Sequence, residues 1–130
     1  MTIGLHHVEL WVADLDTARV AWGWLLESCG WVHDQAWNEG SSWRAGDAYL
    51  VVTRPPTLAG EHHDRRMPGL NHLAIHASST AEVDRIVAEA PKHGWSALYA
   101  DRYPHAGGGE HYAAYLANGA GFKVEVVASG

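Results

Sequence analysis

The sequence predicts an α+β fold made of two copies of one β-α-β-β-β unit. Two stretches of the chain begin alike, with LHHVEL at residues 5–10 and LNHLAI at residues 70–75. Each stretch runs on through alternating, strand-like sequence into a helix-like segment, and each of these segments ends at a Gly-Trp pair, at 30–31 and 94–95. Because an internal repeat determines architecture before any single motif does, this duplication is the main indication of the fold.

The length of the chain fits one domain, which we expect to span residues 1–130. A chain of 130 residues can bury a single hydrophobic core but is too short for two independent ones, so the repeats should pack together. We place repeat one at about 1–54, a linker at 55–69 and repeat two at about 70–130. Residues of the AVILMFWYC set make up 47% of the chain and charged residues 18%, a balance typical of folded proteins rather than disordered ones.

The first repeat opens with a strand over residues 7–12, where apolar and polar side chains alternate with a period of two. A helix follows, with Asp14 or Asp16 as its N-cap and Gly30 as a left-handed stop. Residues 31–53 then contain strand-like pieces that are separated by turn sequences. The first repeat therefore reads β-α-β-β-β.

The second repeat follows a linker that is rich in proline and glycine. Residues 72–77 alternate again, and the sequence STAE at 79–82 has the spacing of a capping box at the start of a helix. After Gly94 we expect three more strands, near 96–99, 112–116 and 122–127. This repeat also reads β-α-β-β-β.

The composition argues against several partners and locations. The formal net charge is −6, and no cluster of basic residues exceeds the pair Arg65 and Arg66, so we expect no nucleic-acid partner. No apolar run approaches the roughly 20 residues that span a bilayer, so we expect no membrane partner. The N-terminus lacks the pattern of a signal peptide, and Cys29 is the only cysteine, so the sequence favours a cytoplasmic protein without an intrachain disulfide.

Three residues are candidate metal ligands. His7 and His72 lie in the first strands of the two repeats, and Glu125 lies on the polar face of the last predicted strand. Two neutral imidazoles and one carboxylate bind Fe²⁺, Mn²⁺, Ni²⁺ or Zn²⁺ and leave coordination positions open for substrate or water. The alternative is a chance match among ten histidines, in which each histidine is satisfied by hydrogen bonds.

The openings HHVELWVADLDTAR and LNHLAIHASSTAEV and the closing segment HYAAYLANGAGFKVEVV resemble the vicinal oxygen chelate superfamily. This superfamily includes glyoxalase I, bleomycin-resistance proteins, fosfomycin-resistance enzymes and extradiol dioxygenases. The resemblance implies that the two units form an open, eight-stranded, barrel-like sheet whose interior holds a divalent metal ion. It also implies that His7, His72 and Glu125 are the ligands and that the protein is a homodimer.

Two positions depart from the pattern of the family. Glyoxalase I has a fourth ligand in the last strand of the first unit, whereas residues 49–53 contain no Asp, Glu, His or Gln. The remaining His-His-Glu set is similar to that of extradiol dioxygenases and several lyases. The Asp-Pro-Asp-Gly turn that is common in the family is replaced by Asn-Gly-Ala-Gly at 118–121, for which we expect a more flexible loop.

Further candidates lie near the expected site. The segment 103–112 resembles one found in small members of the superfamily, and in it Tyr112 and His105 are candidate acids, bases or hydrogen-bond donors. The alternative is a solvent-facing loop with Tyr112 in the sheet. The other histidines, including His111, are expected at the surface or in loops. Residues predicted to contact substrate are Trp11, Trp43, Tyr49, His76 and Glu9. The alternative for His76 is to support a metal ligand by a hydrogen bond rather than to contact substrate.

Two classes of function remain open. The first is a metal-dependent enzyme that chelates adjacent oxygens of a small substrate, with lyase, isomerase or ring-cleaving dioxygenase chemistry. The second is a non-catalytic resistance protein of the bleomycin type, which sequesters an aromatic or hydrophobic antibiotic by stacking. The His-His-Glu set favours the enzyme, and the seven tryptophans favour the binding protein.

Overall fold

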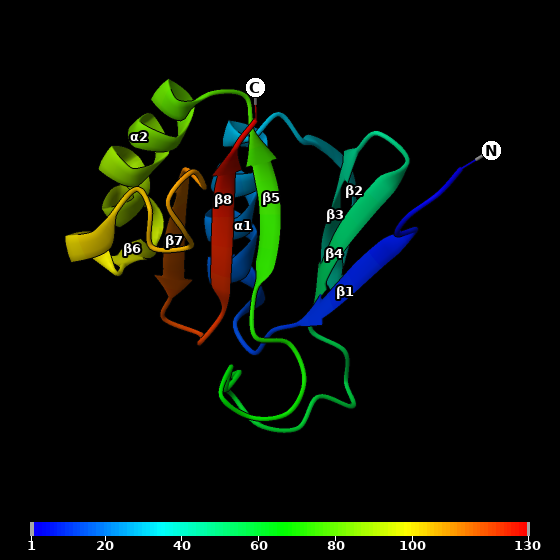
Figure 1. Ribbon diagram of the computed structural model, residues 1–130. Helices are drawn as coiled ribbons and strands as arrows, with labels where there is room; N and C mark the ends of the chain where they lie inside the picture. The colour runs from blue at the N-terminus through cyan, green and yellow to red at the C-terminus, as the bar shows by residue number, and fades with distance from the viewer. Residues whose placement is uncertain (1, 130) are drawn as a thin grey trace. The chain divides into compact units, whose positions relative to one another are not determined.

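The computed structural model describes residues 2–129 and confirms the predicted duplication (Figure 1). The chain forms two compact units, the first up to His62 and the second from His63 onward. Within the described residues each unit holds one four-stranded sheet, with strand order β1-β4-β3-β2 in unit 1 and β5-β8-β7-β6 in unit 2. The architecture is therefore two β-α-β-β-β repeats, as the sequence predicts.

Unit 1 follows the expected element order. Its elements are β1 (His7–Trp11), α1 (Leu15–Ser28), β2 (Val32–Trp37), β3 (Gly40–Ala45) and β4 (Ala48–Thr53). The carboxylate of Asp14 accepts a hydrogen bond from the Thr17 backbone N–H at 3.1 Å, which identifies Asp14 as the N-cap. After the helix, Gly30 takes the predicted left-handed conformation with φ of 89°.

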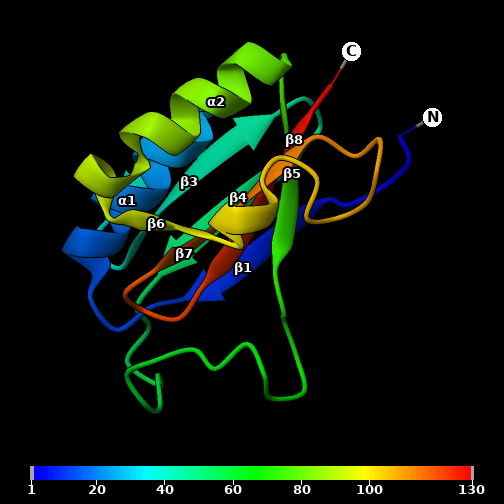
Figure 2. The same ribbon diagram turned by 60° about the vertical axis from the view of Figure 1, so that its left-hand side comes forward.

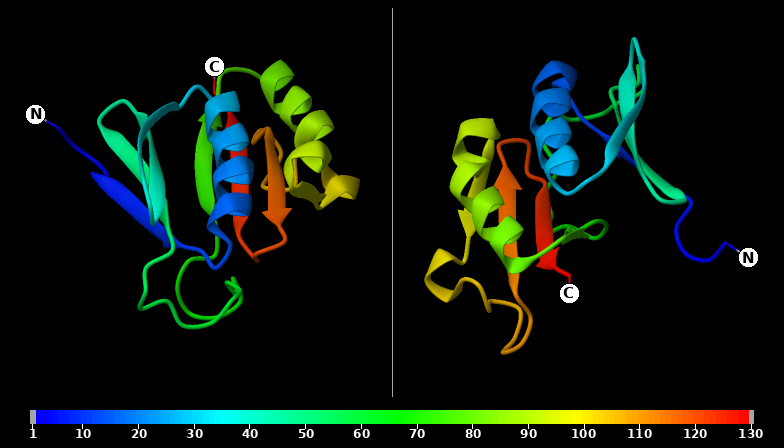
Figure 3. Two further views of the ribbon diagram at one scale, coloured as in Figure 1. Left: turned by 180° about the vertical axis from the view of Figure 1, so that it is seen from behind. Right: turned by 90° about the horizontal axis from the view of Figure 1, so that it is seen from above.

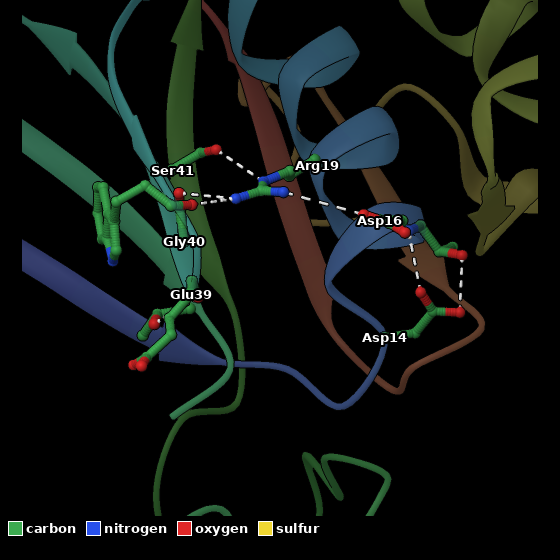
Figure 4. Close-up of polar contacts among 9 residues, drawn as sticks. Asp14, Asp16, Arg19, Glu39, Gly40 and Ser41 are labelled. Atoms are coloured by element: carbon green, nitrogen blue, oxygen red, sulfur yellow. Dashed lines mark hydrogen bonds and ion pairs between the residues drawn. The ribbon is translucent and has the colours of Figure 1, made fainter. Parts of the chain in front are cut away.

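The sheet of unit 1 packs one face against α1. Strand β1 pairs in parallel with β4, and β2 and β3 form a hairpin at the edge of the sheet (Figure 3). The buried apolar residues of this layer are Leu10, Val12, Trp22, Leu25, Leu26, Trp43, Leu50 and Val52. The guanidinium of Arg19 joins the helix to the hairpin, because its N–H groups donate to the Ser41 hydroxyl at 3.0 Å and to the Gly40 carbonyl at 3.0 Å (Figure 4).

Unit 2 repeats the plan. Its elements are β5 (Leu73–Ala77), α2 (Thr80–Glu89), the short 3₁₀ helices η1 (Ala90–His93) and η2 (Ala100–Arg102), β6 (Trp95–Leu98), β7 (Ala113–Asn118) and β8 (Lys123–Ala128). The Ser79 hydroxyl caps α2 by accepting a hydrogen bond from the Glu82 backbone N–H at 3.1 Å, as the STAE sequence predicts. Helix α2 packs against β5, β7 and β8 on one face of the sheet (Figure 2).

The turn between β7 and β8 is more restrained than its composition suggests. The side-chain oxygen of Asn118 accepts hydrogen bonds from the backbone N–H groups of Ala120 and Phe122, at 3.2 and 3.0 Å. The His63 backbone donates to the Ala120 carbonyl at 2.9 Å, and the His63 ring stacks on Phe122 at 4.7 Å. The expected flexible loop is thus held by Asn118 on one side and by His63 on the other.

No helix within residues 2–129 has the length and apolar content that crossing a bilayer requires.

Candidate functional site

The centre of the candidate site is Glu125 in β8. The neighbouring residues Val124 and Val126 are fully buried in the core, so the period of two directs Glu125 to the sheet face opposite α2. Across the sheet, Glu125 pairs with Ala74 of β5 and with Tyr115 of β7. Its exposed fraction is only 7%, and a carboxylate buried to this extent needs partners that compensate for lost hydration.

Three side chains of unit 2 supply these partners. The Nε2 atom of His72 lies 3.2 Å from one carboxylate oxygen of Glu125, and Nε2 of His111 contacts the other oxygen. The phenol of Tyr115 also hydrogen-bonds to Glu125, and burial together with the negative charge of Glu125 raises the pKa of this phenol above its usual value. Tyr115 is therefore a protonated hydrogen-bond donor at neutral pH.

The tautomer of His72 is set by its neighbour Asn71. The amide nitrogen of Asn71 donates to the Arg65 carbonyl at 3.1 Å, which turns the amide oxygen toward Nδ1 of His72 at 2.7 Å. Nδ1 must then carry the proton, and in the neutral ring Nε2 directs a lone pair at Glu125. Two facing lone pairs at 3.2 Å repel each other, so this contact is favourable only with a proton or a metal cation between them.

His111 lies on the loop before β7, as expected, but its contact with Glu125 was not expected. The loop packs closely there: a Cβ at Gly107 would lie 2.6 Å from the Tyr115 hydroxyl oxygen and 2.8 Å from Cδ2 of His111. A Cβ at this position would have to displace one or both of these side chains. One signal in the sequence could have indicated this contact. Tyr115 lies opposite Glu125 in the β7–β8 pair, and His111 is four residues before it, so the alternation of a strand places both on the face of Glu125.

The predicted acid or base residues Tyr112 and His105 are not at the Glu125 carboxylate. The Tyr112 hydroxyl donates to the Asp84 carboxylate of α2 at 2.6 Å, which places this side chain on the helix side of the sheet. Nδ1 of His105 lies 3.2 Å from the His111 carbonyl, and the ring packs edge-on against Tyr112 at 5.7 Å. Tyr115, rather than Tyr112, is the phenol that reaches Glu125.

The other predicted residue of unit 2, His76, lies on the same strand face as His72. Its Nδ1 atom is 2.5 Å from the Ser129 hydroxyl. This contact ties the end of β5 to the residue that follows β8, so the structure gives His76 a structural partner. The predicted substrate contact of His76 stays a prediction.

In unit 1, His7 lies on the sheet face opposite α1. Its ring stacks on Tyr49 at 4.8 Å with an interplanar angle of 6°, and its Nδ1 atom is 2.9 Å from Nδ1 of His6. On the same face Trp11 donates its indole N–H to Glu9 at 2.6 Å. Because His7 belongs to unit 1, the ligand set of His7 with His72 and Glu125 stays a prediction.

Another predicted substrate residue, Trp43, lies on the helix side of the sheet, and its predicted substrate contact stays a prediction. Trp43 pairs with Leu50 of β4 and points toward α1. A Cβ at Gly23 of this helix would lie 3.2 Å from the Trp43 ring, and the indole N–H donates to Glu27 at 3.3 Å. With an exposed fraction of 3%, it belongs to the core between sheet and helix. It does not share the face of Tyr49.

Comparison with known proteins identifies the family. Residues 6–115 match the model of the glyoxalase/bleomycin resistance protein/dioxygenase superfamily. The chain belongs to this superfamily, the vicinal oxygen chelate superfamily. It is 43% identical over 126 residues to YqjT, an uncharacterized protein of Bacillus subtilis (strain 168), covering 95% of this chain and 98% of YqjT.

Solved structures agree with this assignment. A candidate glyoxalase from Bacillus halodurans superposes with a TM-score of 0.89 at 39% identity, covering 96% of this chain and 95% of that chain. A glyoxalase/bleomycin resistance protein from Albidiferax ferrireducens T118 superposes with a TM-score of 0.78 at 21% identity, covering 97% and 98%. The second likeness shows the fold alone.

The donor chemistry in unit 2 suits the divalent ion that the family implies. Within residues 2–129 no three His, Cys, Asp or Glu side chains are arranged as a complete metal site. His72 and His111 bind different oxygens of Glu125, so the three donors do not converge. His72 and Glu125 nonetheless provide two adjacent ligand atoms. Asn71 fixes the tautomer of the His72 ring, as residues that hydrogen-bond to metal-binding histidines commonly do.

Unit 1 also contains an open hollow between α1 and the β2–β3 hairpin. Its volume is about 660 Å³, within the range of small-molecule sites. The rings of His33 and Trp43 lie on this side of the sheet, and the residues that line the hollow are Arg19, Glu27, His33, Ala36, Trp37, Asn38, Ser41 and Trp43. This hollow lies on the helix side of the sheet, away from the face that carries His7 and Tyr49.

Proposed function

We propose that this protein is a metal-dependent enzyme of the vicinal oxygen chelate superfamily that acts on a small substrate with adjacent oxygen atoms. The observation that supports this most is the buried Glu125 carboxylate, with the lone pair of His72 directed at it. Such a pair is favourable when a cation bridges it, and both residues match ligand positions of the family. His7 is the third ligand in this proposal, and the ion is Fe²⁺, Mn²⁺, Ni²⁺ or Zn²⁺.

When bound, the ion would act as a Lewis acid that stabilises an enolate-like or oxyanion state in lyase, isomerase or dioxygenase chemistry. The residues of the chain have separate tasks. Asn71 holds the His72 ring in the tautomer that presents Nε2. His111 occupies the second oxygen of Glu125 and leaves the first oxygen directed at His72. Tyr115, which is protonated at neutral pH, donates a hydrogen bond beside the carboxylate.

Measurement of metal binding by untagged protein tests this proposal. Glu125→Gln preserves the size of the side chain but removes its charge, so the affinity for Zn²⁺ or Mn²⁺ in isothermal titration should fall by at least about tenfold. Glu110→Gln is the matched control, because Glu110 is exposed on the loop before β7. The proposal fails if wild-type protein binds none of the four ions, or if both variants bind as tightly as wild type.

A non-catalytic, drug-sequestering protein is the second candidate, and the hollow of unit 1 favours it. His33 is exposed at the wall of this hollow, where a flat ligand could stack on its imidazole ring. If bleomycin binds there, His33→Ala should weaken binding by about 0.5–1.5 kcal/mol, the range for one contact between aromatic rings. Excess chelator should have no effect on this binding, and Glu125→Gln should leave it intact. Absence of saturable quenching of tryptophan fluorescence by bleomycin would contradict this candidate for that class of drug.

A further inference from the structure

Lys123 lies on the same strand face as Glu125, because the two are separated by one residue of β8. Its ammonium group donates a hydrogen bond to the Tyr99 hydroxyl oxygen at 2.9 Å. It also lies 5.0 Å from the centroid of the Tyr99 ring and 5.2 Å from that of Tyr115. Lys123 is therefore held between two aromatic rings, one of which belongs to the phenol that contacts Glu125.

The ammonium group of Lys123 has no carboxylate partner within 4 Å in the described part of the chain, residues 2–129. A lysine that is partly buried normally has an anionic partner, because two aromatic rings replace only part of its hydration. One of its three N–H groups is used by Tyr99, so two remain for another acceptor.

Further positive charge surrounds the same phenol. The guanidinium of Arg102 lies over the Tyr99 ring at 4.9 Å. The hydrogen bond from Lys123 lowers the pKa of Tyr99, and the charges of Lys123, Arg65 and Arg102 lower it further. Three cations therefore act on one side chain in a protein whose formal net charge is −6.

The backbone of Tyr99 is in a conformation that large residues rarely adopt. Its φ and ψ are 56° and 36°, in the left-handed region, where a bulky residue is strained by on the order of 1–3 kcal/mol. Such strain is concentrated at functional sites, where the surroundings hold the residue in place. Here the conformation brings the Tyr99 ring edge-on to Tyr115 at 5.4 Å and places its hydroxyl on Lys123.

We propose that Lys123 and Tyr99 form an oxyanion-binding subsite beside Glu125. The ammonium donates its remaining N–H groups to a carboxylate or phosphate-type group, and the Tyr99 hydroxyl, which already accepts from Lys123, donates its own proton to the same group. The inference deepens the proposed function, on which it rests for the reacting part of the substrate. The substrate is then an acid whose adjacent oxygens would bind the ion held by His72 and Glu125 and whose anionic group binds Lys123.

Anion binding by chelator-treated protein tests the subsite without involving a metal. Inorganic phosphate and acetate are titrated separately at constant ionic strength, and the backbone amide signals of β8 and residue 99 are followed by NMR. Lys123→Met keeps the length of the side chain but removes its charge, and Tyr99→Phe keeps the ring but removes the hydroxyl. Lys92→Met is the matched control, because the Lys92 side chain is 73% exposed and pairs with Glu89 of the same helical segment.

We expect saturable shifts with at least one anion, and about tenfold weaker binding by Lys123→Met, the effect of losing a charge-assisted hydrogen bond. Tyr99→Phe should weaken binding several-fold, Lys123→Arg should retain it and Lys92→Met should not change it. Preference for phosphate or for acetate identifies the class of anion. The subsite is refuted if neither anion gives saturable shifts, or if Lys92→Met weakens binding as much as Lys123→Met.

Metal titration of the same variants separates this proposal from the proposed function. Lys123→Met should bind Zn²⁺ or Mn²⁺ as wild type does, because Lys123 is not a ligand. If wild type binds anions but no metal, the enzyme proposal fails and the subsite stands. If metal binding is intact in every variant and no anion binds, the subsite fails and the enzyme proposal stands.

Discussion

Replacement of Gly121 by alanine should destabilise the protein more than any other change in the turn between β7 and β8. A Cβ at this position would lie 1.8 Å from the His63 carbonyl oxygen and 2.9 Å from its carbonyl carbon. Real Cβ atoms essentially never approach other heavy atoms closer than 3.0 Å, so the His63 backbone must move by more than 1 Å. The obstacle is a backbone group, which cannot rotate aside as the end of a side chain can.

The magnitude has two sources. Overpacking of a close contact costs about 1–3 kcal/mol, and an alanine with positive φ adds about 1–2 kcal/mol, here at a φ of 95°. The free energy of unfolding should therefore fall by about 2–5 kcal/mol. With a typical dependence on urea of about 1–3 kcal/mol per molar, the unfolding midpoint should fall by at least about 0.7 M.

The assay is urea unfolding followed by circular dichroism and tryptophan fluorescence. Gly119→Ala is the control in the same turn, because a Cβ there meets nothing within 4 Å and the backbone φ is not positive. Its free energy of unfolding should remain within about 0.5 kcal/mol of wild type. Equal midpoints for the two variants would refute the close approach of His63 to the turn. They would also mean that His63, at the start of unit 2, does not restrain the turn before β8.

Three other predictions concern the hairpin, the acid range and assembly. Arg19→Met should lower the free energy of unfolding by about 1–3 kcal/mol, because the Gly40 carbonyl and the Ser41 hydroxyl lose a charged donor (Figure 4). Hydrogen bonds from Tyr103 and Tyr112 lower the pKa of Asp84, so its contribution to stability is present above about pH 4 and is lost as the pH falls through the lower, folded-state pKa. Asp84→Asn should therefore weaken the decline of the urea midpoint between about pH 4 and pH 2. We also propose a homodimer, for which sedimentation should give about twice the mass of the 14.2 kDa chain.

Each of these predictions has a clear contrary outcome. An unchanged urea midpoint for Arg19→Met would mean that the guanidinium does not join α1 to the hairpin. If the urea midpoint of Asp84→Asn falls with decreasing pH as steeply as that of wild type, Asp84 does not contribute to the pH dependence of stability. A monomeric mass at tens of micromolar protein would exclude a stable homodimer.

The amino-acid sequence alone determined the elements and the orientation of Glu125. The caps at Asp14 and Ser79 and the stop at Gly30 were predictable, because each depends on hydrogen bonds or backbone angles within a few residues. The period of two placed Glu125 on the polar face of β8 without knowledge of its neighbours, since alternation within one strand is a local property. The internal repeat then implied the order of the elements in both units.

Only the tertiary structure decided which aromatic side chains share a site. Trp43 was predicted to lie on a substrate-binding face, but the register of β3 against β4 pairs it with Leu50 and turns it toward α1. Tyr112 and Tyr115 are only three positions apart in the sequence. The register of β7 against β8 nevertheless places Tyr115 beside Glu125, while the Tyr112 hydroxyl hydrogen-bonds to Asp84 of α2.

The partners of Glu125 were equally hidden from the sequence. His111 reaches the carboxylate because Gly107 lets the preceding loop pack closely on Tyr115, and Tyr99 reaches Lys123 through a left-handed backbone angle. Local pattern does not encode such contacts, because they depend on the pairing of strands and on the paths of loops between them. The sequence could thus assign a carboxylate to a strand face. The imidazoles, phenols and ammonium group around that carboxylate were determined only by the folded structure.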